Sequence, residues 1–237
     1  MNTKRWPWML GAAVVIAAAA FWAVRRPPPE PQPPVAQTEA APPKPADAAL
    51  PPAAKSDTDM RKDLASLSSR PEWAKWLEAS DLLERFVATV DNVAEDVNPR
   101  KQLDFVALQP QKTDRLDTVR YNLIADVIAS IDAKGAAQVV RDIHPLLESA
   151  YHKLGYPDRS FDQVATKALQ RIIDAPVVEK APRLVPKGLV HAFADEKLEK
   201  LGPVEKLLLR TGPRNTRLIK AKAREIAAAL DLRMAVH

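Results

Sequence analysis

The chain has 237 residues, no cysteine, and 35 Lys and Arg against 30 Asp and Glu, a formal net charge of +5. Without thiols it cannot form disulfide bonds, thiol nucleophiles or cysteine-based zinc and iron–sulfur sites. Its six glycines are isolated from one another, which excludes a P-loop and a dinucleotide-binding G-x-G-x-x-G motif. The mild positive charge and the lack of aromatic residues interleaved with basic ones predict no nucleic-acid partner.

The first predicted element is a membrane anchor that follows a tail of residues 1–5. Residues Trp6 to Val24 carry no charge and have a pair of basic residues on each side. As a helix this segment would be about 28 Å long, close to the ~30 Å core of a bilayer. Tryptophans near both ends are typical of an interfacial aromatic belt. We therefore predict a retained single-pass transmembrane helix over residues 6–24, with a cleaved secretory signal as the alternative.

The orientation of this anchor is predicted from the length of its flanks. Two basic residues on each side leave the charge rule balanced, but the tail before the anchor has only five residues. Long domains translocate largely regardless of their charge, so we expect the amino terminus inside and the domain outside. In a bacterial cell this arrangement anchors the chain in the inner membrane and places its domain in the periplasm.

A proline-rich and alanine-rich linker is predicted over residues 25–59. Eleven of the 22 prolines fall in residues 27–59, which contain no aromatic residue. Such a segment cannot build a core, so we expect a disordered polyproline-II spacer that reaches up to roughly 100 Å. A passive linker fits this composition better than a docking peptide.

Residues 60–237 are numerous enough for one domain with its own core. Apolar residues recur every three or four positions, which predicts a mainly α fold with a single helical globular domain. The first helix is expected to begin after Pro71, and a second one is expected over residues 118–131 and to stop near Gly135. The apolar stripe of the first helix is Trp73, Trp76, Leu77, Leu83, Phe86, Val87 and Val90.

The next helices are predicted from their boundary residues. Over residues 136–154, Gly155 suits the C′ position, and Pro145 should kink the helix or divide it in two. Ser160 is a candidate N-cap for a helix that ends before Pro176.

The carboxyl-terminal part is predicted to hold short helices over residues 195–210 and a longer one over about 213–232. Residues 211–215 should set the angle at which the last helix begins. Two stretches, 103–108 and 184–193, lack helical rhythm, so at most a small β-ribbon is expected there. They either pair as strands or pack as extended chain against the helices. The expected buried stripe of the last helix is Ile219, Ala223, Ile226 and Leu230.

Several sequence strings together resemble a known protein family. The strings are RFVATVDN at 85–92, VRYNLIADVIASID at 119–132, AYHKLGYP at 150–157 and HAFADEKLEKLGPVEKLLLRTGPRN at 191–215. They resemble DUF3014, an uncharacterised family of bacterial envelope proteins with an amino-terminal anchor and a proline-rich spacer. The resemblance covers about residues 72–230, although the stretch 102–111 lacks the glycine that the family has before its aromatic residue. It implies no activity, substrate or cofactor.

The candidate metal ligands are His144, Glu148 and His152, spaced i, i+4 and i+8 on one predicted helix. The two histidines would lie about 12 Å apart along the axis, too far to share one ion through bonds of about 2.1 Å. Pro145 would further distort this spacing. We therefore predict no metal site and no cofactor, and interpret both histidines as surface or interface residues.

The candidate catalytic groups are Asp91, Glu95 and Asp195, because glycoside hydrolysis needs two carboxylates. Asp195 also suits the N-cap of a helix that begins at Glu196. Asp91 and Asn92 suit the carboxyl end of the first long helix and the turn after it. The sequence favours these structural roles, and the catalytic residues of any enzyme activity stay unknown.

A basic stripe is the clearest candidate surface. Its five members, spaced three or four residues apart, would cover about 20 Å of one helix face. One interpretation is an ordinary solvated face, and the other is a platform for phospholipid headgroups, an acidic cell-wall polymer or an acidic protein. The basic stripe consists of Arg210, Arg214, Arg217, Lys220 and Arg224.

The layout predicts a membrane-anchored, non-enzymatic interaction or scaffold module of the bacterial cell envelope. Its partners would be the lipid bilayer, through Trp6 to Val24, and an envelope protein or anionic polymer. The alternative is an anchored hydrolase that acts on peptidoglycan or a related polymer. Energy-transducing envelope proteins share an anchored proline-rich stalk, but their distal domains are shorter and less helical.

Overall fold

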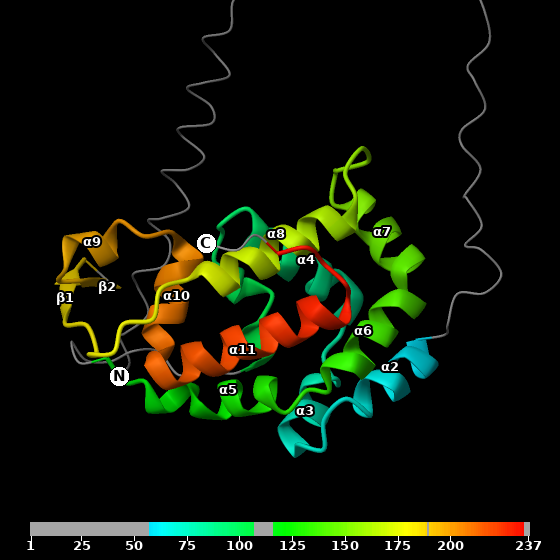
Figure 1. Ribbon diagram of the computed structural model, residues 1–237, viewed down its shortest axis with the longest axis horizontal. Coiled ribbons are helices and arrows are strands. Elements are labelled where there is room, and N and C mark those ends of the chain that lie inside the picture. The colour runs from blue at the N-terminus through cyan, green and yellow to red at the C-terminus, as the bar shows by residue number, and fades with distance from the viewer. Residues whose placement is uncertain (1–56, 107–115, 189, 235–237) are drawn as a thin grey trace, which may run out of the picture. The chain divides into compact units, whose positions relative to one another are not determined.

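The computed structural model describes residues 57–106, 116–188 and 190–234. Within these ranges the chain is mainly helical and contains one two-stranded sheet (Figure 1). The predicted anchor over residues 6–24 and nearly all of the predicted linker lie outside the described residues. Among the helices that are described, none has the length and apolar character needed to cross a bilayer.

The elements follow one another closely along the chain. The α-helices are α2 (Asp57–Ala65), α3 (Pro71–Trp76), α4 (Leu82–Ala94), α5 (Asn122–Ala129), α6 (Ala133–Asp142), α7 (His144–Lys153), α8 (Phe161–Asp174), α9 (Glu196–Glu199), α10 (Pro203–Thr211) and α11 (Pro213–Ala229). Short 3₁₀ turns are η1 (Pro99–Lys101), η2 (Asp104–Val106) and η3 (Val119–Tyr121). The strands are β1 (Leu184–Lys187) and β2 (Val190–Phe193).

The helices α8 and α11 form the centre of the domain. Helix α8 packs against α4, α7, α10 and α11, and α11 packs against α5, α6, α8 and α10. Figure 1 shows α11 between α5 and α8. The largest fully buried side chains of the main core are Tyr151, Phe161, Leu147 and Val87, from α4, α7 and α8. Burial of each such side chain stabilises the fold by about 1.5–3 kcal/mol.

The predicted helix ends around α7 and α8 are confirmed. Pro145 divides the 136–154 run into two helices and occupies the first turn of α7. Proline is tolerated there because the N–H groups of the first turn have no partner within the helix. Gly155 adopts φ 107 directly after the C-cap of α7. The Ser160 side chain accepts a hydrogen bond from Asp162 N, and α8 ends at Asp174, before Pro176.

Two predictions about the earlier helices are wrong. The apolar stripe that begins after Pro71 is divided between α3 and α4 by a turn over residues 77–81, in which Asp81 adopts a left-handed conformation with φ 55. Gly135 does not end the helix over residues 118–131. It lies in the first turn of α6, whose N-cap Asp132 accepts hydrogen bonds from Lys134 N and Gly135 N.

Of the two options left open for stretches 103–108 and 184–193, the small β-ribbon is confirmed, and it lies within the second stretch alone. The second stretch pairs with itself, with Leu184 opposite Phe193 and Lys187 opposite Val190 in antiparallel register. Gly188 has φ 61, which suits the short connection between paired strands. In the first stretch, residues 104–106 form the 3₁₀ turn η2, while 107 and 108 lie outside the described residues.

The buried face of α11 is more polar than its sequence pattern predicts. Ile219, Ile226 and Leu230 are only partly buried. Polar burial is possible here because Lys222 Nζ donates to Ile131 O over 2.6 Å, so its charge retains a partner. The buried residues of α11 are Asn215, Thr216, Lys222, Ala223 and Ala227.

The corner between α10 and α11 depends on a buried amide, as predicted for residues 211–215. Asn215 is 1 % exposed, and its Nδ2 donates to Thr211 O at 2.8 Å, Asn122 Oδ1 at 2.9 Å and Thr118 O at 3.2 Å. The chain turns at Gly212, which has φ 87. These bonds fix where α11 begins relative to α5.

Replacement of Gly212 tests this corner. Gly212→Ala should lower the free energy of unfolding by about 2–4 kcal/mol, because strained φ adds to a steric clash. An added Cβ would lie 2.6 Å from Thr118 Cγ2. Urea unfolding of the detergent-solubilised chain, followed by far-ultraviolet circular dichroism, measures the loss.

Gly155→Ala is the matched control. Gly155 also has positive φ, but an added Cβ would meet nothing within 4 Å. Only the backbone strain should then appear, about 1–2 kcal/mol. Equal losses in the two variants would contradict a steric contribution at Gly212.

Candidate functional site

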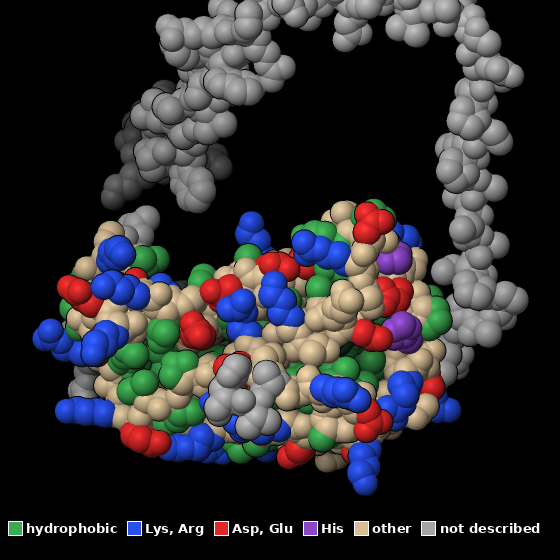
Figure 2. All heavy atoms as spheres, turned by 45° about the horizontal axis from the view of Figure 1, so that its top comes forward, with side chains coloured by type: hydrophobic (Ala, Val, Ile, Leu, Met, Phe, Trp, Pro, Cys, Tyr) green, Lys and Arg blue, Asp and Glu red, His purple; other side chains and the backbone are tan. Residues whose placement is uncertain are grey.

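Charged and polar side chains gather along α8 and the helix ends that meet it. Figure 2 shows histidine and acidic side chains next to one another on one face of the domain. We name three groups. The junction cluster lies where α7 meets α8, the acidic pair lies on α4, and the α8 groove follows the outer face of α8. The junction cluster consists of His144, Glu148, His152 and Asp162.

The junction cluster is organised by Glu148, from the second turn of α7. Its Oε1 accepts hydrogen bonds from Ser160 Oγ at 2.9 Å and Phe161 N at 3.0 Å, and Phe161 N lies 3.0 Å from Oε2 as well. A carboxylate at the amino end of a helix satisfies free N–H groups and is stabilised by the helix dipole. Glu148 thereby joins α7 to the start of α8.

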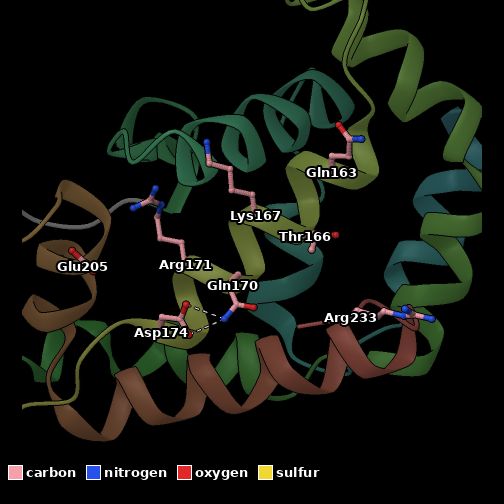
Figure 3. A pocket seen from close by; sticks show the side chains of 8 residues that line it. All are labelled: Gln163, Thr166, Lys167, Gln170, Arg171, Asp174, Glu205 and Arg233. Carbon is pink, nitrogen blue, oxygen red and sulfur yellow. Dashed lines mark hydrogen bonds between the residues drawn. The ribbon is translucent and has the colours of Figure 1, made fainter. Parts of the chain in front are cut away.

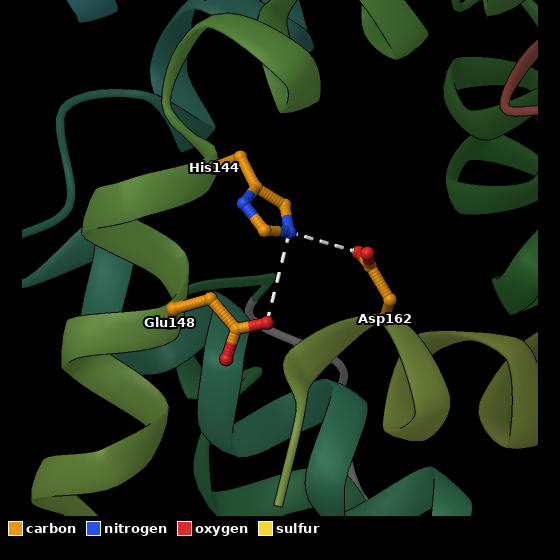
Figure 4. Close-up of side chains that lie close together, drawn as sticks. All are labelled: His144, Glu148 and Asp162. Atoms are coloured by element: carbon orange, nitrogen blue, oxygen red, sulfur yellow. Dashed lines mark hydrogen bonds and ion pairs between the residues drawn. The ribbon is translucent and has the colours of Figure 1, made fainter.

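The same carboxylate holds two histidines. His144 Nε2 lies 3.6 Å from Glu148 Oε1 and 3.1 Å from Asp162 Oδ1 (Figure 4). His152 Nε2 lies 3.7 Å from the other oxygen of Glu148, Oε2. The two histidines therefore face different oxygens of Glu148, as expected from their eight-residue separation.

Sequence reasoning missed Asp162 as a member of this cluster. Donor atoms of His144, Glu148 and Asp162 all lie within 4.8 Å of one another, so Asp162 completes a set of three possible metal ligands. The signal was present in Ser160, because an N-cap there places Asp162 in the first turn of α8. What the sequence alone did not give was the packing of that turn against α7.

The acidic pair consists of Asp91 and Glu95, one turn apart at the end of α4. Burial raises the pKa of Asp91, and the charge of Glu95 raises it further, while Tyr151, Arg159 and Lys167 act in the opposite direction. The Lys167 ammonium, 3.1 Å from Glu95 Oε2, lowers the pKa of Glu95. Two neighbouring carboxyl groups thus have pKa values displaced in opposite directions.

Two polar atoms on the buried side of the acidic pair lack a hydrogen-bond partner. Among the described residues, Asp91 Oδ1 and the Tyr151 hydroxyl are both buried without a hydrogen bond of normal geometry. Burial also raises the pKa of Tyr151, and the charge of Asp91 adds to that increase. Asp91 and Asn92 both lie in the last turn of α4, which confirms their predicted place at the carboxyl end of this helix, although neither reaches the turn after it.

The third candidate carboxylate has a structural role. Asp195 Oδ1 accepts a hydrogen bond from Lys197 N over 2.8 Å at the start of α9, which confirms the predicted N-cap. Nearby, Glu199 Oε2 accepts from Phe193 N over 3.0 Å, which lowers the pKa of Glu199 and ties β2 to α9.

The α8 groove is an open depression of about 500 Å³ (Figure 3). Two of its basic residues brace helices, since Lys167 lies 3.1 Å from Glu95 and Arg171 lies 3.6 Å from Asp96. Its charges are of both signs, so it has no dominant electrostatic preference. It is lined by Gln163, Thr166, Lys167, Gln170, Arg171, Asp174, Glu205 and Arg233.

The prediction that the basic stripe lies on one helix face is wrong, because the chain turns at Gly212 and leaves Arg210 on α10 and the other four members on α11. The first two members make contacts inside the domain. Arg210 donates to His191 O over 2.7 Å and lies over the ring of Phe193, 5.0 Å from its centroid. Arg214 Nη2 lies 2.6 Å from Asp126 Oδ1 on α5. Both guanidinium groups therefore help to hold neighbouring elements.

The other members differ in exposure. Arg217 pairs with Glu179, and Lys220 donates to Ala175 O. Burial lowers the pKa of Lys220, and the charge of Arg224 lowers it further. Arg224 is exposed. An anionic partner of the basic stripe stays a prediction. Most of these basic side chains already make contacts within the domain, so such a partner would compete with those contacts.

A family model described as "Protein of unknown function (DUF3014)" matches residues 82–227. The chain belongs to the DUF3014 family. The match runs from the start of α4 almost to the end of α11, so it includes the junction cluster, the acidic pair and the basic stripe. No curated protein and no solved structure matches the chain. The DUF3014 description names no activity.

Asp91→Asn should raise the free energy of unfolding at neutral pH. Because the pKa of Asp91 is raised in the folded state, its contribution to stability is present at low pH and is lost as pH rises through that pKa. The amide removes this unfavourable charge, and solvent screening keeps the gain to about 1 kcal/mol or less. The gain should vanish near about pH 3, where the wild-type carboxyl is largely protonated.

Urea unfolding at both pH values measures this difference. Glu95→Gln is the control with the opposite sign, because a lowered pKa stabilises the folded chain at neutral pH and that contribution is lost on acidification. An Asp91→Asn variant that is less stable than wild type at neutral pH would contradict the account of the acidic pair.

Proposed function

We propose that this protein is a membrane-anchored, non-enzymatic interaction or scaffold module of the bacterial cell envelope. The observation that carries the proposal is that two of its three candidate catalytic carboxylates are used to hold the domain together. Asp195 caps α9, and Glu95 pairs with Lys167 and Arg159 across to α8 and the loop before it. A hydrolase would need such groups free to reach a substrate.

The layout of the chain supports a tethered role. In this proposal Trp6 to Val24 stays in the inner membrane and residues 27–56 form the spacer, because α2 already begins at Asp57. The helical domain then works in the periplasm. A spacer of roughly 100 Å suits a domain that must reach partners away from the bilayer. The partner is an envelope protein or an anionic polymer.

Exposed apolar side chains favour a protein among these partners. Val119 is 71 % exposed and Leu123, one helical turn later, is 48 % exposed. Asp126, a further turn along α5, pairs with Arg214 of the basic stripe. An apolar pair beside charged residues is a typical composition for a protein contact surface.

Crosslinking in intact cells tests the interaction role. A photo-crosslinking amino acid at Leu123 should give a discrete adduct with a partner, and one at Lys200, whose side chain is 80 % exposed on another part of the domain, should not. Capture of the same abundant proteins at both positions would contradict a specific surface around Leu123.

One observation favours the hydrolase alternative. Paired carboxyl groups with pKa values displaced in opposite directions are a pattern of acid and base catalysts, and Asp91 and Glu95 show that pattern. Asp91 would then be the proton donor and Glu95 the ionised partner.

Release of soluble fragments from purified peptidoglycan distinguishes the two functions. The module proposal expects no release by the wild-type chain. Release that is lost in a folded Asp91→Asn variant would contradict it and establish the hydrolase. Asp195→Asn is the matched control, because asparagine also serves as an N-cap and should leave both fold and turnover unchanged.

A further inference from the structure

We infer that the junction cluster binds one divalent transition-metal ion, for which Zn²⁺ is the best match. The three donors are His144 Nε2, Glu148 Oε1 and Asp162 Oδ1. One imidazole nitrogen and two carboxylate oxygens form a ligand set that zinc accepts, with a fourth position left for water. His152 is not a ligand, because it faces the other oxygen of Glu148.

Two of the separations between donor atoms are close to those around a tetrahedral ion. Bonds of about 2.0–2.2 Å to a tetrahedral centre place neighbouring ligand atoms about 3.3–3.6 Å apart. His144 Nε2 lies 3.1 Å from Asp162 Oδ1 and 3.6 Å from Glu148 Oε1, and all three donor atoms lie within 4.8 Å of one another. The side chain of Asp162 is 60 % exposed, so it has room to rotate toward an ion.

The arrangement of charges in the cluster also suits a cation. Two carboxylates converge on one nitrogen of His144, and that nitrogen carries at most one proton, which can serve only one of them. A metal ion between the three groups would bind all of them at once. It would also remove the repulsion between Glu148 and Asp162.

Glu148 is held in place for this role by groups that are not ligands. Ser160 Oγ donates to Oε1 over 2.9 Å, and Phe161 N lies 3.0 Å from both carboxylate oxygens. Oε2 can therefore keep the Phe161 hydrogen bond when Oε1 binds the ion. Such outer contacts orient a ligand and typically change metal affinity by about 10–100-fold.

The position of the cluster defines what the ion would do. His144 and Glu148 come from the first two turns of α7, and Asp162 comes from the first turn of α8. One ion would therefore lock the corner between these helices. The side chains of His144 and Asp162 are 38 % and 60 % exposed, so the ion can enter from solvent.

Isothermal titration of Zn²⁺ into the full-length chain, purified in detergent without a histidine tag, tests this inference. One ion should bind per chain, and His144→Ala and Asp162→Asn should each weaken the zinc affinity about tenfold or more. His191→Ala, which removes a histidine of β2, is the matched control and should leave the affinity unchanged. Circular dichroism checks that every variant is folded.

Several results would overturn the inference. These are no zinc binding by the wild-type chain, unchanged binding in both ligand variants, or loss in His152→Ala together with full binding in His144→Ala. The inference does not rest on the proposed function. Zinc binding can fail while crosslinking at Leu123 succeeds, and crosslinking can fail while zinc binds. Failure of this inference is therefore distinguishable from failure of the proposed function.

Discussion

The hydrogen bonds from Phe161 N and Ser160 Oγ to Glu148 fix the start of α8, and the rest of the domain is arranged around that helix. Phe161 is 1 % exposed, so its backbone N–H would lack a partner at the end of a helix if Glu148 did not accept from it. A buried N–H left without a partner costs about 1–3 kcal/mol. One carboxylate therefore sets both the direction of α8 and its distance from α7.

The position of α8 determines which charged groups meet. Its first turn brings Asp162 to His144, and the next turns bring Lys167 to Glu95 and Arg171 to Asp96 of the segment after α4. Its apolar face packs Phe161 and other core residues against α4 and α7 at the same time. The candidate metal ligands and the displaced pKa values of the acidic pair thus have a common structural origin.

Local signals in the sequence predicted several helix ends correctly. They failed where contacts between distant parts of the chain determine the conformation. Ser160, Asp195 and Gly155 act through bonds or φ values within a few residues, so their roles could be read directly. The break at Asp81 was not predicted, because Asp81 adopts φ 55 at the N-cap of α4 without a side-chain cap bond, and the apolar spacing continues across it. Asp162 was missed as a candidate metal ligand for the same reason, since it reaches His144 through the packing of two helices.

Native-state hydrogen exchange at the Phe161 amide shows whether Glu148 holds the amino end of α8. We expect slow exchange at this amide in the wild-type chain and fast exchange in Glu148→Ala, with Ala168 in the interior of α8 still protected. A Phe161 amide that exchanges as fast as an unstructured residue in the wild-type chain, or that stays equally protected in the variant, would contradict the account.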